Sequence, residues 1–438
     1  MFETIENYIA AWATWLWGPP MLIVLSLVGI YFTLRLRGLQ FTRFFRSAKL
    51  TFVSKAETGE GNITPLQALY SALGGVIGNA NIAGPATAIA LGGPGAIFWM
   101  WIASFIGMVI VYSETLLALK HREKSADGTY SGGPMYYIQK ILKLRWLAVL
   151  FAVAMGTKTL MATATIQSNS ISLAAHTATG IPMAAACIIL AFLTWLVIVG
   201  GIKSIARVLG KITPAMVGIY LTAGLIIIVF NISNIFEAFR LIFSSAFTYK
   251  GASGGFAGAS VMMALRYGVA RGFYSNEAGT GSNPIMFSTA KTDNPVNQSL
   301  IGMFGVFIDT VVGTITGIII LITGVWNSGL TSTALTTEAF ADVFSGAGGY
   351  IMLVSSFLFG YSTLIAWCFY GEQCFAYVWG DRIKIYFRWA FCIAIIFGYF
   401  SVESLWSVGD LLNGFTILTN LVALVFLIKY VFRESYQT

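Results

Sequence analysis

Charged residues are scarce in this chain. Asp, Glu, Lys and Arg make up 10% of its 438 residues, whereas a soluble domain has about 25%. Hydrophobic residues make up 57%. A chain with so few charges lacks the polar side chains needed to cover a water-exposed surface, so most of its surface must face lipid. The composition therefore predicts an integral membrane protein.

Histidine and cysteine are rare as well, which argues against catalytic and metal sites. The two histidines, His121 and His176, fall in predicted loops without partners for a catalytic triad. The four cysteines lie in or at the ends of apolar runs, without the spacing of metal ligands. A phosphate-binding loop of the Walker type is also lacking. We therefore expect no enzyme, no resident cofactor and no direct use of ATP.

Long apolar runs dominate what is present. A membrane-spanning helix needs about 20 consecutive apolar residues, and the chain has about eleven such runs. A further segment, Ile235 to Phe247, is too short to span and has the pattern of an amphipathic helix at the membrane surface. The fold class predicted is an all-α integral membrane protein. The predicted spans are 16–34, 66–91, 95–119, 147–172, 181–201, 212–231, 256–287, 299–325, 349–375, 384–402 and 414–432.

The N-terminal segment and the basic residues predict the topology. The first fifteen residues carry Glu3 and Glu6 and lack the positive region of a cleavable signal peptide. Short cytoplasmic loops accumulate Lys and Arg, and 23 of the 26 basic residues, Arg266 and Arg271 among them, fall on one side. We expect a multi-pass protein of a bacterial inner membrane, with its N-terminus outside and its C-terminus in the cytoplasm. This topology explains the net charge of +8 without a nucleic-acid partner.

Two of the spans are interrupted by glycine, asparagine and proline. The first reads ALGGVIGNANIAGPATAI from Ala72 to Ile89, and the second ends in GVARGFYSNEAGTGSNP at Pro284. Unpaired backbone groups cost several kcal/mol in a bilayer, so irregular backbone there indicates a binding site. Close helix packing would explain the glycines, but not the asparagines. The second helix is expected to unwind either at Gly254 and Gly255 or at Gly268 to Gly272.

The two broken helices also predict an internal repeat. Without the extra N-terminal helix at 16–34, ten spans remain, and dividing them into five and five puts a broken helix first in each half. Because the first half enters from the cytoplasm and the second from outside, the repeats are expected to be inverted. The chain is thus predicted to be a single transporter domain, 1–438, with repeats at 66–231 and 256–432.

The ninth span carries a pattern that suits a cation. Phe359, Ser362 and Thr363 are spaced i, i+3, i+4, which places one carbonyl and two hydroxyls on one helix face. Hard cations bind through oxygen, although such hydroxyls often bond back to their own helix. Trp367, one turn later on that face, predicts an aromatic wall for a small zwitterion.

Two ionisable residues lie inside predicted spans, where charges are rare and usually functional. Lys158 is in the fourth span and Asp309 in the eighth, and they are candidates for an ion pair or a proton relay. The alternative for Lys158 is a lysine that snorkels from a helix end. A titrating Lys158 or Asp309 would make the protein a proton-coupled transporter. A channel is a further alternative, but it needs polar lining along several helices.

Several motifs resemble the alanine or glycine:cation symporter family, the sodium:alanine symporters. The resemblance covers nearly the whole chain. It implies a leucine-transporter-like fold with a five-plus-five inverted repeat, in which sodium and a small neutral amino acid, alanine or glycine, bind at the broken helices and enter by alternating access. The motifs are ALGGVIGNANIAGPATAIALGGPGAIFWMW, GGPMYYI, GVARGFYSNEAGTGSNPI, AKTDNPVNQ, GMFGVFIDT and YSTLIAWCFYGEQC.

The resemblance also implies site residues. It places sodium at the carbonyls of Gly74, Ile77 and Phe359 and the hydroxyls of Ser362 and Thr363. It places the substrate at Gly78, Asn79, Gln167, Phe273, Thr363 and Trp367. Asn81 falls where the family has an asparagine and is a candidate for coupling. Three departures, Asn79 for threonine, Ala80 for glycine and Pro85 for valine, leave the substrate range open, and the oligomeric state is not predicted.

Overall fold

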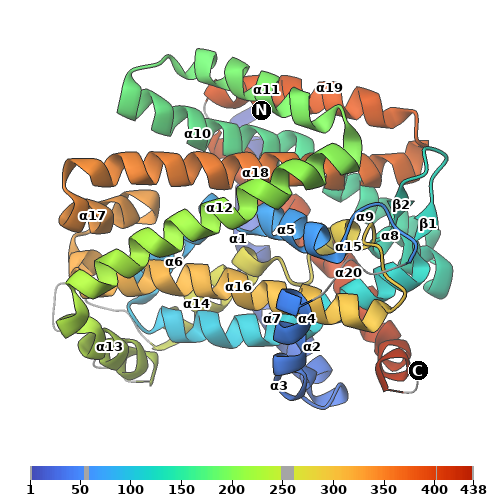
Figure 1. The fold of residues 1–438 in the computed structure, drawn as a ribbon, viewed down its shortest axis with the longest axis horizontal. Helices are drawn as coiled ribbons and strands as arrows, with labels where there is room; N and C mark the ends of the chain where they lie inside the picture. The colour runs from blue at the N-terminus through green and yellow to red at the C-terminus, as the bar shows by residue number, and fades with distance from the viewer. Residues whose placement is uncertain (1, 54–58, 248–260, 401, 437–438) are drawn as a thin grey trace.

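The computed structural model describes residues 2–53, 59–247, 261–400 and 402–436. Helices make up almost all of these residues, and the long ones pack side by side (Figure 1). Two short strands, β1 (Glu123–Lys124) and β2 (Tyr130–Ser131), form an antiparallel hairpin. The predicted all-α fold class is confirmed.

The helices of the N-terminal part begin before the first predicted span. The predicted span at 16–34 corresponds to α2, and α1 was not predicted; it packs against the last helix of the chain. Pro19, at the first position of α2, separates the two helices. The four N-terminal helices are α1 (Phe2–Leu16), α2 (Pro19–Arg35), α3 (Leu39–Thr42) and α4 (Phe44–Val53).

The middle of the chain begins with the first broken helix and ends with the surface helix. Its elements are α5 (Pro65–Val76), α6 (Asn79–Gly92), α7 (Ala96–His121), α8 (Pro134–Tyr137), the π-helical turn η1 (Ile138–Leu142), α9 (Arg145–Lys158), the π-helical turn η2 (Thr159–Thr163), α10 (Ala164–Thr179), α11 (Met183–Ile198), α12 (Gly201–Phe230), the 3₁₀ turn η3 (Ile232–Asn234) and α13 (Ile235–Phe247).

The last part of the chain begins with the second broken helix. Its elements are α14 (Val261–Asn276), α15 (Ser282–Phe287), α16 (Pro295–Ile322), the 3₁₀ turn η4 (Val325–Asn327), α17 (Ser332–Phe344), α18 (Gly346–Trp379), α19 (Ile383–Ile396), the 3₁₀ turn η5 (Phe397–Tyr399) and α20 (Glu403–Tyr436).

The eleven predicted spans each correspond to described helices, except that the first residues of the span 256–287, up to 260, lie outside the described part of the chain. Among the described residues, seven helical stretches are long and apolar enough to cross a membrane, counting α1 with α2 as one stretch and α9, η2 and α10 as another. The shorter helices α11 and α19 and the broken pairs α5/α6 and α14/α15 fill the remaining four positions. The repeat boundaries at 66–231 and 256–432 stay a prediction.

The first break lies where the sequence predicts it, between α5 and α6. Ile77 and Gly78 leave the helical conformation, and Gly78 is extended, with φ −118° and ψ −166°. Pro85 lies inside α6, where a residue without an N–H leaves the carbonyl of Asn81 without its usual partner. Thr316 of α16 donates a hydrogen bond to that carbonyl at 3.0 Å. The departure at Pro85 is therefore accommodated by a neighbouring helix.

The second break corrects the predicted position. α14 stays helical through Gly268 and Gly272 and ends at Asn276, and the chain is irregular from 277 to 281. Gly268 and Gly272 serve close packing on α7 instead, because a Cβ atom on Gly272 would lie 2.8 Å from Ala103 Cβ. The break is made by left-handed backbone, at Glu277 among others. Gly254 and Gly255 lie outside the described residues.

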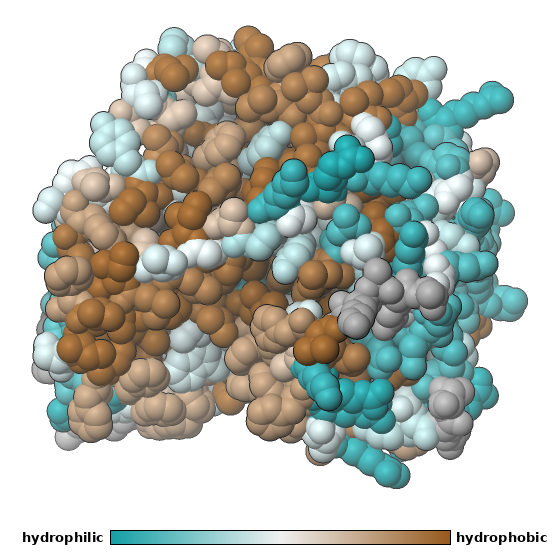
Figure 2. Space-filling view, viewed as in Figure 1, coloured by the Kyte–Doolittle hydropathy of each residue, from teal (hydrophilic) through white to brown (hydrophobic). Residues whose placement is uncertain are grey.

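The ends of the molecule differ in polarity. Figure 2 shows hydrophilic side chains gathered at the end where β1, β2 and the C-terminus lie, and a largely hydrophobic face elsewhere. α14 begins at the opposite end of the molecule, beside the start of α7. Its first turn packs there against the loop before α7, where a Cβ atom on Gly92 would lie 3.0 Å from Met263 O. Assigning Arg266 and Arg271 to the basic side was therefore wrong. That assignment followed from placing the second break too early in the chain.

The predicted surface helix is present as α13, with the predicted bounds. It packs against α7, α14 and α16. Its exposed aromatic residues, Phe236, Phe239, Phe243 and Phe247, are 36–79% accessible. A short helix with one buried and one exposed aromatic face is typical of the membrane interface.

Candidate functional site

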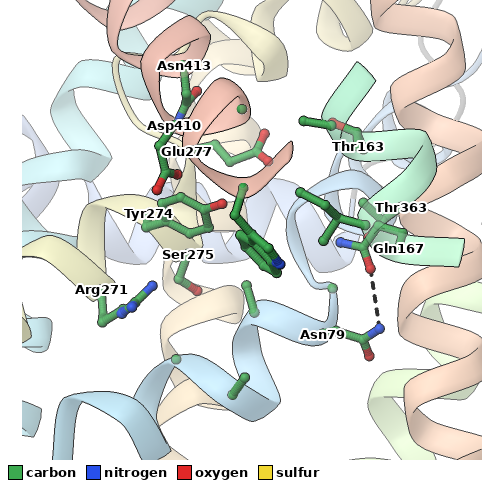
Figure 3. Close-up of a pocket in the computed structure, with 18 of the residues that line it drawn as sticks. Asn79, Thr163, Gln167, Arg271, Tyr274, Ser275, Glu277, Thr363, Asp410 and Asn413 are labelled. Carbon is green, nitrogen blue, oxygen red and sulfur yellow. Dashed lines mark hydrogen bonds between the residues drawn. The ribbon is translucent and has the colours of Figure 1, made fainter. Parts of the chain in front are cut away.

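A cavity of about 420 Å³ lies at the two breaks. It is walled by α6, α10, α14, α18 and α20, with the ends of α5 and α9 (Figure 3). Of the residues predicted for the substrate or for coupling, those that line it are Gly78, Asn79, Lys158, Gln167, Thr363 and Trp367. The tertiary structure therefore brings together segments that lie far apart in the sequence, such as those of Gly75 and Trp367, 292 residues apart.

Phe273 does not belong to this group. It is 2% exposed and packs in the hydrophobic core, whereas the next two residues, Tyr274 and Ser275, line the cavity. Because α14 continues to Asn276, successive side chains point about 100° apart around the helix. The structure therefore keeps Phe273 out of the cavity lining, and its contact with a substrate stays a prediction.

Two side-chain amides meet on one wall of the cavity. Asn79 Nδ2 donates to Gln167 Oε1 at 3.3 Å, the dashed line in Figure 3. Ser356 Oγ of α18 donates to Asn79 Oδ1 at 3.0 Å. A Cβ atom at Gly360 would lie 3.0 Å from Asn79 Nδ2, so this glycine makes room for the larger side chain. Asn79 thus joins three helices, α6, α10 and α18.

The helix ends at the breaks give the cavity two polarities. Gly78, Asn79 and Ala80, at the N-terminal end of α6, line it, and Tyr274, Ser275 and Glu277, at the C-terminal end of α14, line it as well. A helix N-terminus carries partial positive charge and a C-terminus partial negative charge. The cavity therefore offers a place for a carboxylate at α6 and one for an ammonium group at α14.

Backbone oxygens are released from helical hydrogen bonds at the first break. In a regular helix Gly78 N–H would donate to Gly74 O, but it donates to Val76 O at 2.9 Å and to Asn81 Oδ1 at 3.2 Å. Likewise Asn81 N–H donates to Gly78 O rather than to Ile77 O. The carbonyls of Gly74 and Ile77 are therefore outside the helical ladder.

The ninth-span pattern meets these oxygens. Thr363 Oγ1 lies 3.4 Å from Gly74 O and donates to Phe359 O at 2.9 Å. Ser362 Oγ donates to Phe359 O at 3.0 Å. Both hydroxyls thus bond back to their own helix, the alternative weighed from the sequence. Because each keeps lone pairs free, this arrangement is also compatible with a bound cation.

Trp367 and Lys158 form a second wall. Trp367 is 3% exposed and its Nε1 donates to Gly75 O at 3.2 Å. Lys158 Nζ lies 4.0 Å from the centroid of the Trp367 ring and donates to Asn413 Oδ1 at 2.8 Å. The ammonium is buried beside the cavity, so the snorkelling interpretation of Lys158 is wrong.

Asp309 occupies a different place. It does not line the cavity, and among the described residues it forms no ion pair with Lys158. Its carboxylate accepts from Asn81 Nδ2 at 2.6 Å and from Ser275 Oγ at 2.9 Å. Asp309 therefore links the two broken helices, and the predicted pair with Lys158 is wrong because each residue has its own partners.

Sequence reasoning missed most of the charged lining. Figure 3 shows Arg271, Glu277 and Asp410 across the cavity from Asn79. Glu277 lies in the motif YSNEAGTG and has φ 54°, a conformation that non-glycine residues adopt mainly at strained or functional sites. Asp410 and Asn413 belong to α20, for which no motif was noted. Their approach to the breaks depends on tertiary packing alone.

Comparison with known proteins decides the family. The sequence model of the sodium:alanine symporter family matches residues 2–437. The chain belongs to this family. It is therefore a multi-pass membrane transporter and not an enzyme.

Two relatives and one solved structure are similar to this chain over most of its length. It is 41% identical over 447 residues to the sodium/alanine symporter AgcS of Methanococcus maripaludis, covering 99% of this chain and 96% of that protein. It is 36% identical over 437 residues to the probable sodium/glutamine symporter GlnT of Bacillus subtilis, covering 99% and 90%. The crystal structure of MhsT in complex with L-phenylalanine aligns with a TM-score of 0.59 and 14% identity, covering 86% of this chain and all of MhsT. That likeness shows the leucine-transporter-like fold.

Proposed function

We propose that this symporter imports a small neutral amino acid, alanine or glycine, together with sodium, by alternating access. The observation that carries the proposal is the group of oxygens at the first break, where the freed Gly74 carbonyl meets Thr363. Carbonyl and hydroxyl oxygens gathered in this way suit a hard cation such as sodium. The group lies beside a cavity that has places for both charges of a zwitterion.

The two ligands are assigned to neighbouring positions. Sodium binds the carbonyls of Gly74, Ile77 and Phe359 and the hydroxyls of Ser362 and Thr363. The amino acid binds with its carboxylate at the start of α6 and its ammonium group at the end of α14. Gln167, Asn79 and Trp367 enclose its side chain. Because Thr363 belongs to both sets, occupancy of one site changes the other, which is the physical basis of coupling.

One sodium ion suffices for accumulation. Entry of one charge at about 100 mV releases about 2.3 kcal/mol, and a tenfold sodium gradient adds about 1.4 kcal/mol. Together they support roughly 500-fold accumulation of a neutral substrate. We place the N-terminus outside and the C-terminus in the cytoplasm of a bacterial inner membrane, because most of the basic residues fall in the loops predicted to be cytoplasmic.

Proton coupling is the second candidate, and one observation favours it. Asp309 joins Asn81 of the first broken helix to Ser275 of the second. A carboxyl group that gained or lost a proton there would change the contact between the two breaks. Such a transporter would work without sodium.

Uptake into proteoliposomes tests these candidates. Labelled alanine, glycine, serine, glutamine and leucine are presented with a sodium gradient, with a proton gradient, or with potassium in place of sodium. We expect concentrative uptake of alanine and glycine only with sodium, and saturable counterflow, which a channel does not show. Uptake that persists without sodium and follows the proton gradient would instead support coupling through Asp309 or Lys158. Preference for glutamine would contradict the proposed substrate.

A further inference from the structure

One face of α5 is directed at α12, and it reaches the proposed cation site. Gln67, Ser71 and Gly74 are spaced i, i+4, i+7 and share this face. A Cβ atom at Gly210 of α12 would meet Gln67 Cγ at 4.0 Å, and one at Gly74 would lie 2.8 Å from Thr213 Oγ1. α12 therefore brings Thr213 to the residue whose carbonyl is released at the first break.

The hydroxyl of Thr213 is buried and unsatisfied. Thr213 is 1% exposed, and within the described part of the chain its Oγ1 has no hydrogen-bond partner. Buried threonines in this protein usually donate to a carbonyl of the preceding turn, as Thr194 does to Leu190 at 2.8 Å. A buried hydroxyl without a partner costs about 1–3 kcal/mol. Native proteins keep few such groups, and those that remain often serve a function.

Ser71 shows the same feature on the opposing helix. It is fully buried, and its Oγ also has no partner among the residues described. It precedes Gly74 by one turn on the face directed at α12. The interface between α5 and α12 thus carries two unsatisfied hydroxyls, and that of Thr213 lies beside Gly74.

The atoms around Thr213 favour a cation over another partner. Ser362 Cβ would lie 3.4 Å from a Cβ atom at Gly74, so Ser362 and Thr213 flank the same residue. The hydroxyls of Ser362 and Thr363 already have acceptors for their protons: both donate to Phe359 O, and the longer contacts are Ser362 Oγ to Met216 Sδ and Thr363 Oγ1 to Gly74 O, each at 3.4 Å. The hydroxyl oxygens of these residues still have free lone pairs. A hard cation binds through the lone pairs of several oxygens.

We propose that the hydroxyl of Thr213 is a further oxygen ligand of the sodium ion held at Gly74, Ile77, Phe359, Ser362 and Thr363. The inference rests on the proposed function, because it takes sodium to bind at that site. It adds α12 to a site otherwise built from α5, its break and α18. Sodium then holds three helices together, and its release loosens the contact of α12 with the end of α5.

Thr213→Val tests this, because valine keeps the branched shape and removes the hydroxyl. Thr213→Ser keeps the hydroxyl, and Thr194→Val is the matched control, since it removes an equally buried hydroxyl that bonds only to its own helix. The readouts are the sodium concentration for half-maximal alanine uptake and, on purified protein, the rise in melting temperature with sodium. If Thr213→Val does not reach the membrane, Thr213→Ala replaces it.

We expect Thr213→Val to raise the half-saturating sodium concentration about tenfold or more, the effect of losing one contact to a charge. Thr213→Ser should stay within about twofold of the unmodified protein, and Thr194→Val should not change it. Unchanged sodium dependence in Thr213→Val, while Ser362→Ala still impairs it, would refute the role of Thr213 and leave the proposed site intact. If the unmodified protein shows no sodium effect in either readout, both the inference and the proposed function fail.

Discussion

Replacing Ser362 and Thr363 together with alanine removes two hydroxyl oxygens from the proposed cation site and leaves the backbone unchanged. Both hydroxyls donate to Phe359 O, at 3.0 and 2.9 Å. Their contacts with other helices are longer: Thr363 Oγ1 lies 3.4 Å from Gly74 O, and Ser362 Oγ lies 3.4 Å from Met216 Sδ of α12. Phe359 O keeps its backbone partner in the continuous helix Gly346–Trp379. We therefore expect the double variant to fold.

The expected magnitudes differ for folding and for sodium binding. Each neutral hydrogen bond contributes about 0.5–1.5 kcal/mol, so folding loses about 1–3 kcal/mol for the pair. A contact to a charge contributes about 1.5–3 kcal/mol, so sodium binding loses about 3–6 kcal/mol. That loss corresponds to roughly 10²- to 10⁴-fold weaker sodium binding. Sodium-stimulated uptake should therefore disappear at ordinary sodium concentrations while the protein remains in the membrane.

Uptake of labelled alanine at increasing sodium concentrations measures this, with size-exclusion profiles to check folding. The matched control is Ser113→Ala with Thr194→Ala, two buried hydroxyls that each donate to their own helix at 2.8 Å. The control should keep the sodium dependence of the unmodified protein. A Ser362→Ala, Thr363→Ala variant whose half-saturating sodium concentration lies within about threefold of normal would refute the site.

Three further substitutions test the cavity and the second break. Lys158→Met should fold, because methionine fills similar volume without a buried charge. The variant should no longer accumulate alanine against a gradient. Uptake from a concentrated outside solution, which needs no accumulation, shows whether the variant is folded. Trp367→Ala should let leucine compete with alanine in uptake. An overlarge side chain in a packed site costs about 1–3 kcal/mol, and the substitution removes that cost by opening space. The same substitution should weaken the binding of alanine, because the smaller substrate no longer fills the site. Gly281→Ala should lower the melting temperature, because Gly281 has φ +82° and a Cβ atom there would lie 2.5 Å from Pro134 Cγ and 2.9 Å from the Phe151 ring.

Each of these expectations has an outcome that contradicts it. Full concentrative uptake by Lys158→Met would make the lysine a structural residue. Leucine that inhibits the unmodified protein as well as alanine does would show that Trp367 does not limit substrate size. For Gly281, the control is Gly218→Ala in α12, where a Cβ atom has open space. Equal melting temperatures for the two alanine variants would contradict a steric role for Gly281.

The first break and the ninth-span pattern were predictable because their signals are local. Gly78, Asn79 and Asn81 interrupt an apolar run within a few residues, and Phe359, Ser362 and Thr363 share a face by helical periodicity alone. Glycine spacing at the second break was ambiguous. Gly268 and Gly272 have the composition of an unwound segment, but they are the close-packing surface of an intact helix.

By itself, the sequence determined the membrane class, the eleven spans, the position of the first break and the family, because length, apolar content and motifs are properties of the chain before it folds. Only the tertiary structure decided which partners the charged residues have. It separated Lys158 from Asp309, brought Arg271 into the cavity and moved Phe273 out of it, and it placed Asp410 and Thr213 beside the breaks. The physical reason is that a contact between helices depends on the angle and register at which they pack, and a shift of one residue along a helix turns a side chain by about 100° to another face.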